Sequence, residues 1–488
     1  MSAHLRRTRI IATLGPATDA PGMLKRVLAE GVDVVRLNFS HGEADDHRAR
    51  AAAVRAVAAE LDREVAVLGD LQGPKIRVER FAEGAVQLEA GAAFTLDCRP
   101  DAPAGDASRV GVGYHDLWRD VKPGDTLLLD DGLIALEVVE VVPQFVHCRV
   151  VIGGRLSDRK GINRQGGGLT VAALSDKDRA DIRLAAELGI DFLAVSFVKT
   201  AADIEQARAL LREAGGEAAL VAKIERSEAI AALGEIVDAA DVVMVARGDL
   251  GVEIGDAELP GLQKKIIRET LERNRVVITA TQMMQSMVES PIPTRAEVLD
   301  VANAVIDGTD AVMLSQETAS GRHPDKAVAA MRRVCLGAER QFEPAADFAA
   351  PASPLDRTDQ AIALATMFLA ARISVRAIVA LTESGATARW LSRHRSTVPI
   401  YALSRNAGAR RRMLLFRDVY PIEFDPHDVG PTQAARAAIQ HLFDLGHLAE
   451  DDRVILTNGD HTGQLGGTNT LKLLRVGPGG MAVGLGDL

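Results

Sequence analysis

Three charged residues lie in or directly after short apolar segments, where side chains are normally uncharged. Lys223 and Glu225 flank Ile224 at the end of the apolar run 220–224, and Asp249 follows the run 242–246. Residues i and i+2 of a strand point to the same side, so Lys223 and Glu225 form either a buried ion pair or part of a polar site. Glu225 and Asp249 could share a divalent cation, and two carboxylates with open positions suit Mg²⁺ or Mn²⁺.

Basic residues accompany these carboxylates. Arg36 lies within the apolar run 34–38 and Arg77 follows the run 66–71. Together with Lys223 they would place several positive charges around the metal. Such a set suits an anionic phosphoryl group in transfer. The residues alone therefore predict a metal-assisted enzyme that acts on a phosphorylated or carboxylate substrate.

Eight short apolar runs alternate with longer Ala/Leu/Glu/Arg stretches, which is typical of βα units around a parallel sheet. The runs are 9–13, 34–38, 66–71, 192–196, 220–224, 242–246, 276–280 and 311–314, and helices are expected at 43–61 and 176–188. Polar residues follow most runs, where they either cap the next helix or line an active site at the carboxyl ends of barrel strands. These residues include Arg36, Asn38, Ser40, Asp70, Lys223, Glu225, Gly248, Asp249, Thr281, Ser315 and Glu317.

Three domains are expected. Residues 1–73 and 161–345 together have the length of a (β/α)₈ TIM barrel, about 250 residues. Residues 74–160 contain alternating strands and turn dipeptides, which predicts an inserted small all-β domain. Residues 346–488 return to α/β alternation and predict a C-terminal α/β domain.

The composition limits the partners. The chain has 488 residues and a net charge of −10, which argues against nucleic acid as a main partner. Its three widely spaced cysteines indicate buried thiols in a reducing cytoplasm. The short apolar piece at 10–14 predicts neither export nor membrane insertion.

Seven segments, in order along the barrel, resemble pyruvate kinase, and 466–476 resembles the closing strand of that family. The segments are 13–17 (TLGPA), 36–42 (RLNFSHG), 70–77 (DLQGPKIR), 221–225 (VAKIE), 245–251 (VARGDLG), 279–283 (TATQM) and 312–319 (VMLSQETA). The resemblance implies glycolytic phosphoryl transfer from phosphoenolpyruvate to ADP, giving pyruvate and ATP, by a cytoplasmic homotetramer.

The resemblance also implies roles for the substrate-site residues. Glu225 and Asp249 would hold the metal, Lys223 and Arg36 would contact the phosphoryl group, and the backbone amides of Gly248 and Asp249 would receive the substrate carboxylate. The enolate left after transfer needs a proton at carbon. The family pattern places Thr281 near that carbon, with Ser315 and Glu317 completing a water relay.

For ADP, the resemblance points to Pro16, His41, Arg77, Asp131 and Lys160. Asp131 and Lys160 lie on the insert, which would close as a lid and exclude water from the reaction. Asp131 and Gly132 are also typical of a hairpin turn.

The potassium site of the family would use Asn38, Ser40, Asp70 and the carbonyl of Leu71. Lys75 stands where many members have an acidic residue. Its ammonium could supply the charge of the cation, so activity is expected not to require K⁺.

In the C-terminal region, 381–387 (LTESGAT) resembles the effector loop of the family. Thr382, Ser384, Gly385 and Thr387 would bind a sugar phosphate or AMP, although a capped helix start explains the same residues. Two other functions share parts of the pattern. One is a metal-dependent barrel enzyme that works through a pyruvate enolate, and the other is a non-catalytic metabolite-binding regulator.

Overall fold

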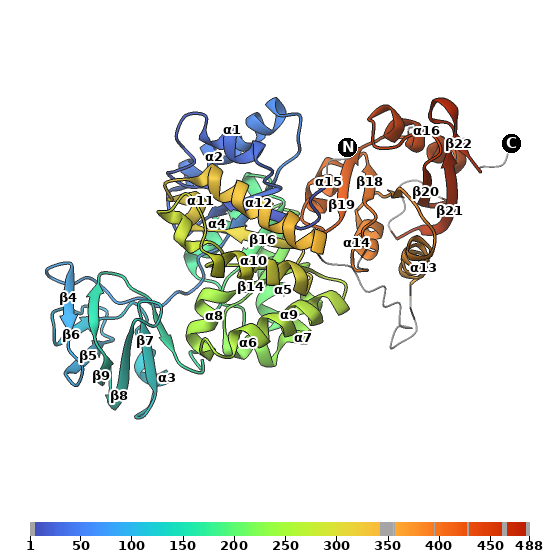
Figure 1. Ribbon diagram of the computed structural model, residues 1–488. Coiled ribbons are helices and arrows are strands. Elements are labelled where there is room, and N and C mark those ends of the chain that lie inside the picture. Colours follow the sequence, from blue (N-terminus) through green and yellow to red (C-terminus); the bar gives the residue numbers. More distant parts are fainter. Residues whose placement is uncertain are drawn as a thin grey trace.

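The computed structural model describes residues 5–341, 355, 357–394, 396–426, 429–460 and 466–484. A central barrel carries a β-rich insert on one side and an α/β unit on another (Figure 1). Within these ranges, no helix combines the length and apolar character needed to cross a bilayer. Cys98, Cys148 and Cys335 are buried and unpaired.

Eight parallel strands close into a barrel, as predicted. Their order around the barrel is β1-β16-β15-β14-β13-β12-β3-β2. Five of the predicted ranges coincide with strands, and the other three differ by one residue at one end. The strands are β1 (Arg9–Thr13), β2 (Val34–Asn38), β3 (Ala66–Asp70), β12 (Phe192–Val195), β13 (Ala219–Ile224), β14 (Val242–Ala246), β15 (Val276–Ala280) and β16 (Ala311–Leu314).

Helices surround this barrel, and side-chain caps fix where several of them begin. Ser175 and Thr294 each accept a hydrogen bond from the amide three residues on, the capping-box arrangement. The helices are α1 (Met23–Ala29), α2 (Ala44–Glu60), α4 (Asp176–Glu187), α5 (Ala201–Glu213), α6 (Ser227–Ala231), α7 (Leu233–Ala239), α8 (Arg247–Ile254), α9 (Leu259–Glu272), α10 (Arg295–Asp307), α11 (Gln316–Ala319) and α12 (Pro324–Gln341), with the 3₁₀ turn η1 (Gln285–Val288).

The insert between β3 and β12 forms two sheets around its own apolar core. One sheet has the order β11-β7-β8-β9-β5-β6, and β10 pairs with β4 in the other. The elements are β4 (Ala85–Leu88), β5 (Ala93–Asp97), β6 (Arg109–Gly111), α3 (Leu117–Asp120), β7 (Thr126–Leu129), β8 (Ile134–Val142), β9 (Phe145–Ile152), β10 (Gly154–Ser157) and β11 (Ile162–Arg164). Because β11 pairs with β7, the sheet continues past residue 160.

The C-terminal unit has a six-stranded sheet of order β19-β18-β17-β20-β21-β22, in which β20 and β21 are antiparallel. Its elements are α13 (Thr358–Arg372), β17 (Ala377–Leu381), α14 (Ala386–Ser392), β18 (Ile400–Ser404), α15 (Ala407–Met413), β19 (Val419–Glu423), α16 (Pro431–Asp444), β20 (Arg453–Gly459), β21 (Thr468–Val476), the 3₁₀ turn η2 (Pro478–Gly480) and β22 (Ala482–Val483). β21 covers most of the predicted closing strand.

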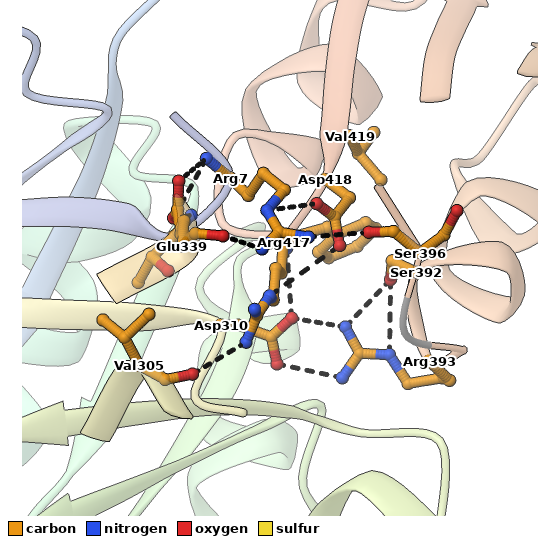
Figure 2. A network of polar contacts seen from close by, with 12 residues as sticks. Arg7, Val305, Asp310, Glu339, Ser392, Arg393, Ser396, Arg417, Asp418 and Val419 are labelled. Carbon is orange, nitrogen blue, oxygen red and sulfur yellow. Dashed lines mark hydrogen bonds and ion pairs between the residues drawn. The ribbon is translucent and has the colours of Figure 1, made fainter. Parts of the chain in front are cut away.

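A polar network attaches the C-terminal unit to the amino-terminal end of the barrel (Figure 2). Asp310, directly before β16, accepts hydrogen bonds from the Arg393 guanidinium (2.9 Å) and from the Arg417 amide (3.0 Å). Glu339 of α12 accepts from the Arg7 amide at 3.0 Å. The C-terminal unit therefore lies at the end of the barrel opposite the carboxyl ends of its strands.

Candidate active site

Lys223 lies at the centre of a polar cluster at the carboxyl end of the barrel. Its Nζ is 2.9 Å from Glu225 Oε1 and 3.3 Å from Asp70 Oδ1, and it donates to Ser196 Oγ at 2.6 Å. Strands β13, β3 and β12 supply or immediately precede these residues. Burial alone would lower the pKa of Lys223, but the charges of Asp70 and Glu225 outweigh burial and raise it. The ammonium therefore stays protonated.

Arg36 of β2 extends this cluster. Its Nε lies 2.6 Å from Asp70 Oδ2, and its guanidinium donates to Thr13 Oγ1 at 3.1 Å. Burial would raise the pKa of Asp70, yet Lys223 and Arg36 together hold it below its ordinary value. Asp70 is thus an ionised carboxylate that fixes both cations at the barrel mouth.

Ser196 is a site residue that the sequence analysis did not single out. Its hydroxyl accepts from Lys223 and donates to the carbonyl of Leu71 at 2.7 Å. The sequence feature that could have identified Ser196 is its position at the end of the fourth apolar run. Gly73 packs against it: φ is +66°, and a Cβ there would lie 2.8 Å from Ser196 Cβ, so glycine is required for this approach.

Glu225 and Asp249 are the two carboxylates that the sequence analysis expects to hold a metal. Burial raises the pKa of Glu225, and the charge of Asp249 adds to this effect while Lys223 opposes it. Glu225 Oε2 accepts from the Phe197 amide at 2.8 Å, whereas Lys75 Nζ lies 3.0 Å from Asp249 Oδ1.

The donor set fits a hard divalent cation. Among the described residues, no group of three or more His, Cys, Asp or Glu side chains could hold a metal. A site with two carboxylates leaves positions for water and substrate oxygens, which is how Mg²⁺ is usually bound.

The start of α8 is held by Thr281, which follows β15. Thr281 has φ +68° and its Oγ1 accepts from the Gly248 amide at 2.8 Å and donates to the Ala280 carbonyl at 2.6 Å. Arg247 donates to the Thr281 carbonyl at 2.8 Å and to Asp300 at 2.6 Å. The first turn of α8, which carries Asp249, is therefore fixed against Thr281.

Glu317 forms hydrogen bonds to the two chain segments that follow β15 and β16. It is 1 % exposed, and its two carboxylate oxygens accept from the Ser315 amide at 2.7 Å and the Met284 amide at 3.1 Å. Glu317 thus joins the segment after β16 to the segment that follows Thr281.

Comparison with known proteins identifies the family. The family model described as the pyruvate kinase barrel domain matches residues 5–328, and that of the pyruvate kinase alpha/beta domain matches 360–474. The chain belongs to the pyruvate kinase family. It is 52% identical to pyruvate kinase II of Salmonella typhimurium over 480 residues, which cover 98% of this chain and 100% of that protein.

Further relatives agree. Identity is 49% to pyruvate kinase of Haemophilus influenzae, over 94% of this chain and 97% of that protein. A crystal structure of a pyruvate kinase from Cryptosporidium parvum superposes with a TM-score of 0.90 at 32% identity, over 96% of each chain. The pyruvate kinase family is a family of phosphotransferases, and this activity is favoured over the enolate-lyase and non-catalytic alternatives. The family implies a divalent metal cofactor.

The nucleotide residues expected from the pyruvate kinase pattern lie in two groups. Pro16 follows β1 and His41 follows β2. Burial lowers the pKa of His41, and the positive charges of Arg77 and Arg36 act in the same direction. On the insert, Lys160 Nζ lies 2.8 Å from Asp130 Oδ1. The neighbouring Asp131 has φ +56° within the turn after β7.

The potassium-site residues of the pyruvate kinase pattern are already partly engaged. Asn38 Oδ1 accepts from the Ser40 amide at 3.1 Å, and the Asp70 carbonyl accepts from the Phe39 amide at 3.0 Å. Leu71 offers its carbonyl to Ser196, as described above. Lys75 contacts the carboxylate of Asp249 and not these groups.

The effector-loop residues line a cavity beside β17 in the C-terminal unit. Thr382, Ser384 and Thr387 contribute to it together with Arg405. Thr382 Oγ1 accepts from the Gly385 amide at 3.0 Å, and Thr387 Oγ1 lies 2.6 Å from Thr468 Oγ1. Glu383 forms an ion pair with Arg405 at 3.2 Å.

Proposed function

We propose that this chain transfers the phosphoryl group of phosphoenolpyruvate to ADP at the carboxyl end of its barrel. The observation that carries the proposal is the Lys223 cluster: a protonated ammonium and a guanidinium held by one buried carboxylate, beside Glu225 and Asp249. Two fixed cations next to a metal site suit the charge that spreads over a phosphoryl group during transfer.

In this proposal Glu225 and Asp249 hold the divalent cation, either Mg²⁺ or Mn²⁺. When bound, the cation neutralises charge on the substrate carboxylate and phosphate oxygens. Lys223 and Arg36 contact the phosphoryl group. The amides of Gly248 and Asp249 receive the substrate carboxylate, and because the Gly248 amide donates to Thr281 Oγ1, substrate would take over that donor.

The phosphoryl phosphorus exchanges its bond to the enolpyruvate oxygen for a bond to a β-phosphate oxygen of ADP. The enolate that leaves then gains a proton at carbon. Thr281 is proposed to lie on the path of the proton to the enolate carbon. Ser315 and Glu317 are proposed to order the water molecules that relay the proton to Thr281. The two amide bonds that Glu317 accepts favour a positioning role for this carboxylate.

ADP is proposed to bind between Pro16, His41 and Arg77 on the barrel side and Asp131 and Lys160 on the insert. The domain division 1–73 with 161–345, 74–160 and 346–488 makes residues 74–160 the closing lid. Closure would exclude water and so prevent hydrolysis of the phosphoryl group.

Regulation is proposed to use the cavity lined by Thr382, Ser384 and Thr387, with Gly385 allowing the turn through its φ of +85°. Arg405 adds a positive side chain suited to a sugar phosphate or AMP. We also propose that the chain assembles as a homotetramer in the cytoplasm.

A coupled assay with phosphoenolpyruvate, ADP and Mg²⁺ tests the main function, with pyruvate as the readout. The wild-type chain is expected to form pyruvate, and Lys223→Met to lose most of the rate. Lys25→Met, which removes an exposed lysine paired with Glu60, is the matched control and should retain full rate. Absence of pyruvate, or an active Lys223→Met variant, would overturn the proposal.

A further inference from the structure

The chain leaves the insert through a short segment that lies against the barrel. We call this segment, residues 164–169 from the end of β11 onward, the strap. Three consecutive glycines in it, Gly166 to Gly168, have φ of +81°, +77° and +91°, so the strap is a turn. The Gln165 amide donates to the Thr126 carbonyl of the insert at 3.0 Å. Because β11 belongs to the insert sheet, a movement of the insert is transmitted to the strap.

Two barrel elements contact the strap. The Gly166 amide donates to the Glu253 carbonyl at 3.0 Å, near the end of α8. At the start of α6, Ser227 Oγ donates to the Gly166 carbonyl at 3.0 Å. In the same helix, Glu228 Oε1 accepts from the Gly168 amide at 2.5 Å. The strap is therefore hydrogen-bonded to both α6 and α8, which also pack against each other.

A buried ion pair joins the same two elements. Arg226, directly before α6, has its Nε 3.1 Å from Oε1 of Glu253 on α8. The other carboxylate oxygen of Glu253 accepts from the Ser227 amide at 2.9 Å. The Arg226 and Glu253 side chains are 5% and 1% exposed, so salt screens this pair little. The pair fixes the end of α8 against the start of α6.

The segments that this pair joins also carry the carboxylates of the proposed metal site. Glu225 directly precedes Arg226, and Asp249 lies four residues before Glu253 on α8. Residues four apart on a helix lie on the same face, about 6 Å apart along its axis. The Arg226–Glu253 pair therefore connects the same two segments that a metal bound by Glu225 and Asp249 would connect.

We propose that Arg226 is a positioning residue that sets the separation of the two metal carboxylates and couples it to the insert. By holding Glu253, it fixes α8 relative to the segment of Glu225, and the strap is bonded to both. The inference rests on the proposed function, because it takes Glu225 and Asp249 as the metal carboxylates. Groups that orient metal-binding side chains contribute strongly to metal affinity. A cation bound by both carboxylates favours one position of the strap, because coupling between two sites is reciprocal.

Binding of Mn²⁺ to the full chain, measured by electron paramagnetic resonance without nucleotide or phosphoenolpyruvate, tests the positioning role. Arg226→Met removes the guanidinium and should weaken binding by ~10-fold or more. Arg393→Met is the matched control, because it breaks an ion pair of the same exposure, 5% and 1%, at the opposite end of the barrel. It should leave the affinity within about twofold of wild type. A general loss of stability would affect both variants alike.

Glu253→Gln provides a second variant, which keeps the volume of the side chain. In a buffer above the pKa of Glu253, about 7, the substitution removes the charge that holds Arg226. It should weaken Mn²⁺ binding by about 10-fold without lowering the melting temperature. A residue with a merely structural role would not separate metal affinity from stability in this way.

Hydrogen–deuterium exchange of the strap measures the coupling to the insert without turnover. In wild type, Mn²⁺ should slow exchange of the peptide that contains the Gly166 and Gly168 amides. In Arg226→Met at saturating Mn²⁺, this slowing should be absent.

The proposal is overturned if either variant, once folded, binds Mn²⁺ within about twofold of wild type, or if Arg393→Met weakens binding as much as they do. It is also overturned if Mn²⁺ leaves strap exchange in wild type unchanged. A wild-type chain that binds no Mn²⁺ and forms no pyruvate overturns the proposed function as well. A wild-type chain that does both, beside variants of unchanged affinity, overturns only the role of Arg226.

Discussion

Lys75 Nζ lies 3.0 Å from Asp249 Oδ1, so an ammonium group lies beside one of the two carboxylates of the proposed metal site. The side chain reaches there across the barrel mouth from the segment after β3. We expect this fixed positive charge to replace the charge that a monovalent cation would otherwise supply. The contact supports the prediction on potassium without involving the groups at Asn38, Ser40 and Asp70.

Turnover is therefore expected to be equal in sodium-only and potassium buffers of matched ionic strength. Lys75→Gln should lower the rate in sodium, and potassium should restore part of it, because the variant lacks the fixed charge. Initial rates of pyruvate formation provide the measurement. A large potassium stimulation of the wild type would contradict the prediction.

Thr281→Ala should reduce kcat by about 10²-fold, the usual scale for losing a group on a proton path. The variant loses the hydroxyl that accepts from the Gly248 amide and so also loosens the first turn of α8. Thr281→Ser keeps the hydroxyl and should retain most of kcat. Steady-state kinetics of both variants compare them, and similar losses in the two would show that the hydroxyl is not what matters.

Arg393→Met should weaken attachment of the C-terminal unit to the barrel by about 3 kcal/mol, because it leaves a buried carboxylate without its guanidinium partner. The Arg393 and Asp310 side chains are 5% and 1% exposed. The midpoint of the first transition in urea unfolding measures the effect. Arg322→Met is the control, since its pair with Glu289 is 72% and 67% exposed and should change stability by less than about 1 kcal/mol.

Glu253→Gln should stabilise the chain in a pH-dependent way. Burial raises the pKa of Glu253 from 4.5 to about 7, although Arg226 lies only 3.1 Å from its carboxylate. Between pH 4.5 and 7 the folded chain therefore keeps the proton on Glu253, while the unfolded chain releases it. As a result, the free energy of unfolding of the wild type decreases as the pH rises through this window. Glutamine does not titrate, so the free energy of unfolding of the variant does not decrease in this way.

The difference in melting temperature between Glu253→Gln and wild type should grow from about pH 4.5 to about pH 7 and stay constant above it. Thermal melts in a buffer series of constant ionic strength measure this difference. A difference that is flat across the window would contradict the assignment of a raised pKa to Glu253.

Much of the catalytic half could be predicted because its information is local. Apolar runs bounded by polar residues predict the barrel strands to within one residue, since each strand is buried on both faces. The i, i+2 spacing of Lys223 and Glu225 predicts a shared direction, and the structure has them 2.9 Å apart. Their neighbours Asp70 and Ser196 come from other strands, and no spacing along the chain indicates which strand ends meet.

Other contacts depended on backbone geometry within a turn. Lys160 pairs with Asp130, whereas the sequence motif drew attention to Asp131. Both aspartates have left-handed backbone conformations, with φ of +51° and +56°, so adjacent side chains leave the turn in different directions. A period-2 or helical pattern cannot resolve such a turn.

The sequence by itself determined the (β/α)₈ barrel, the presence of further units and the family, and it indicated the acidic and basic residues of the candidate site. Periodicity and short motifs depend only on residues that are close together in the sequence, so they can be recognised without the structure. Only the tertiary structure decided that Lys75 pairs with Asp249 and that Asp310 pairs with Arg393. Both contacts join residues that lie far apart in the sequence. They follow from how the units pack and which charges that packing buries together, which no single stretch of sequence encodes.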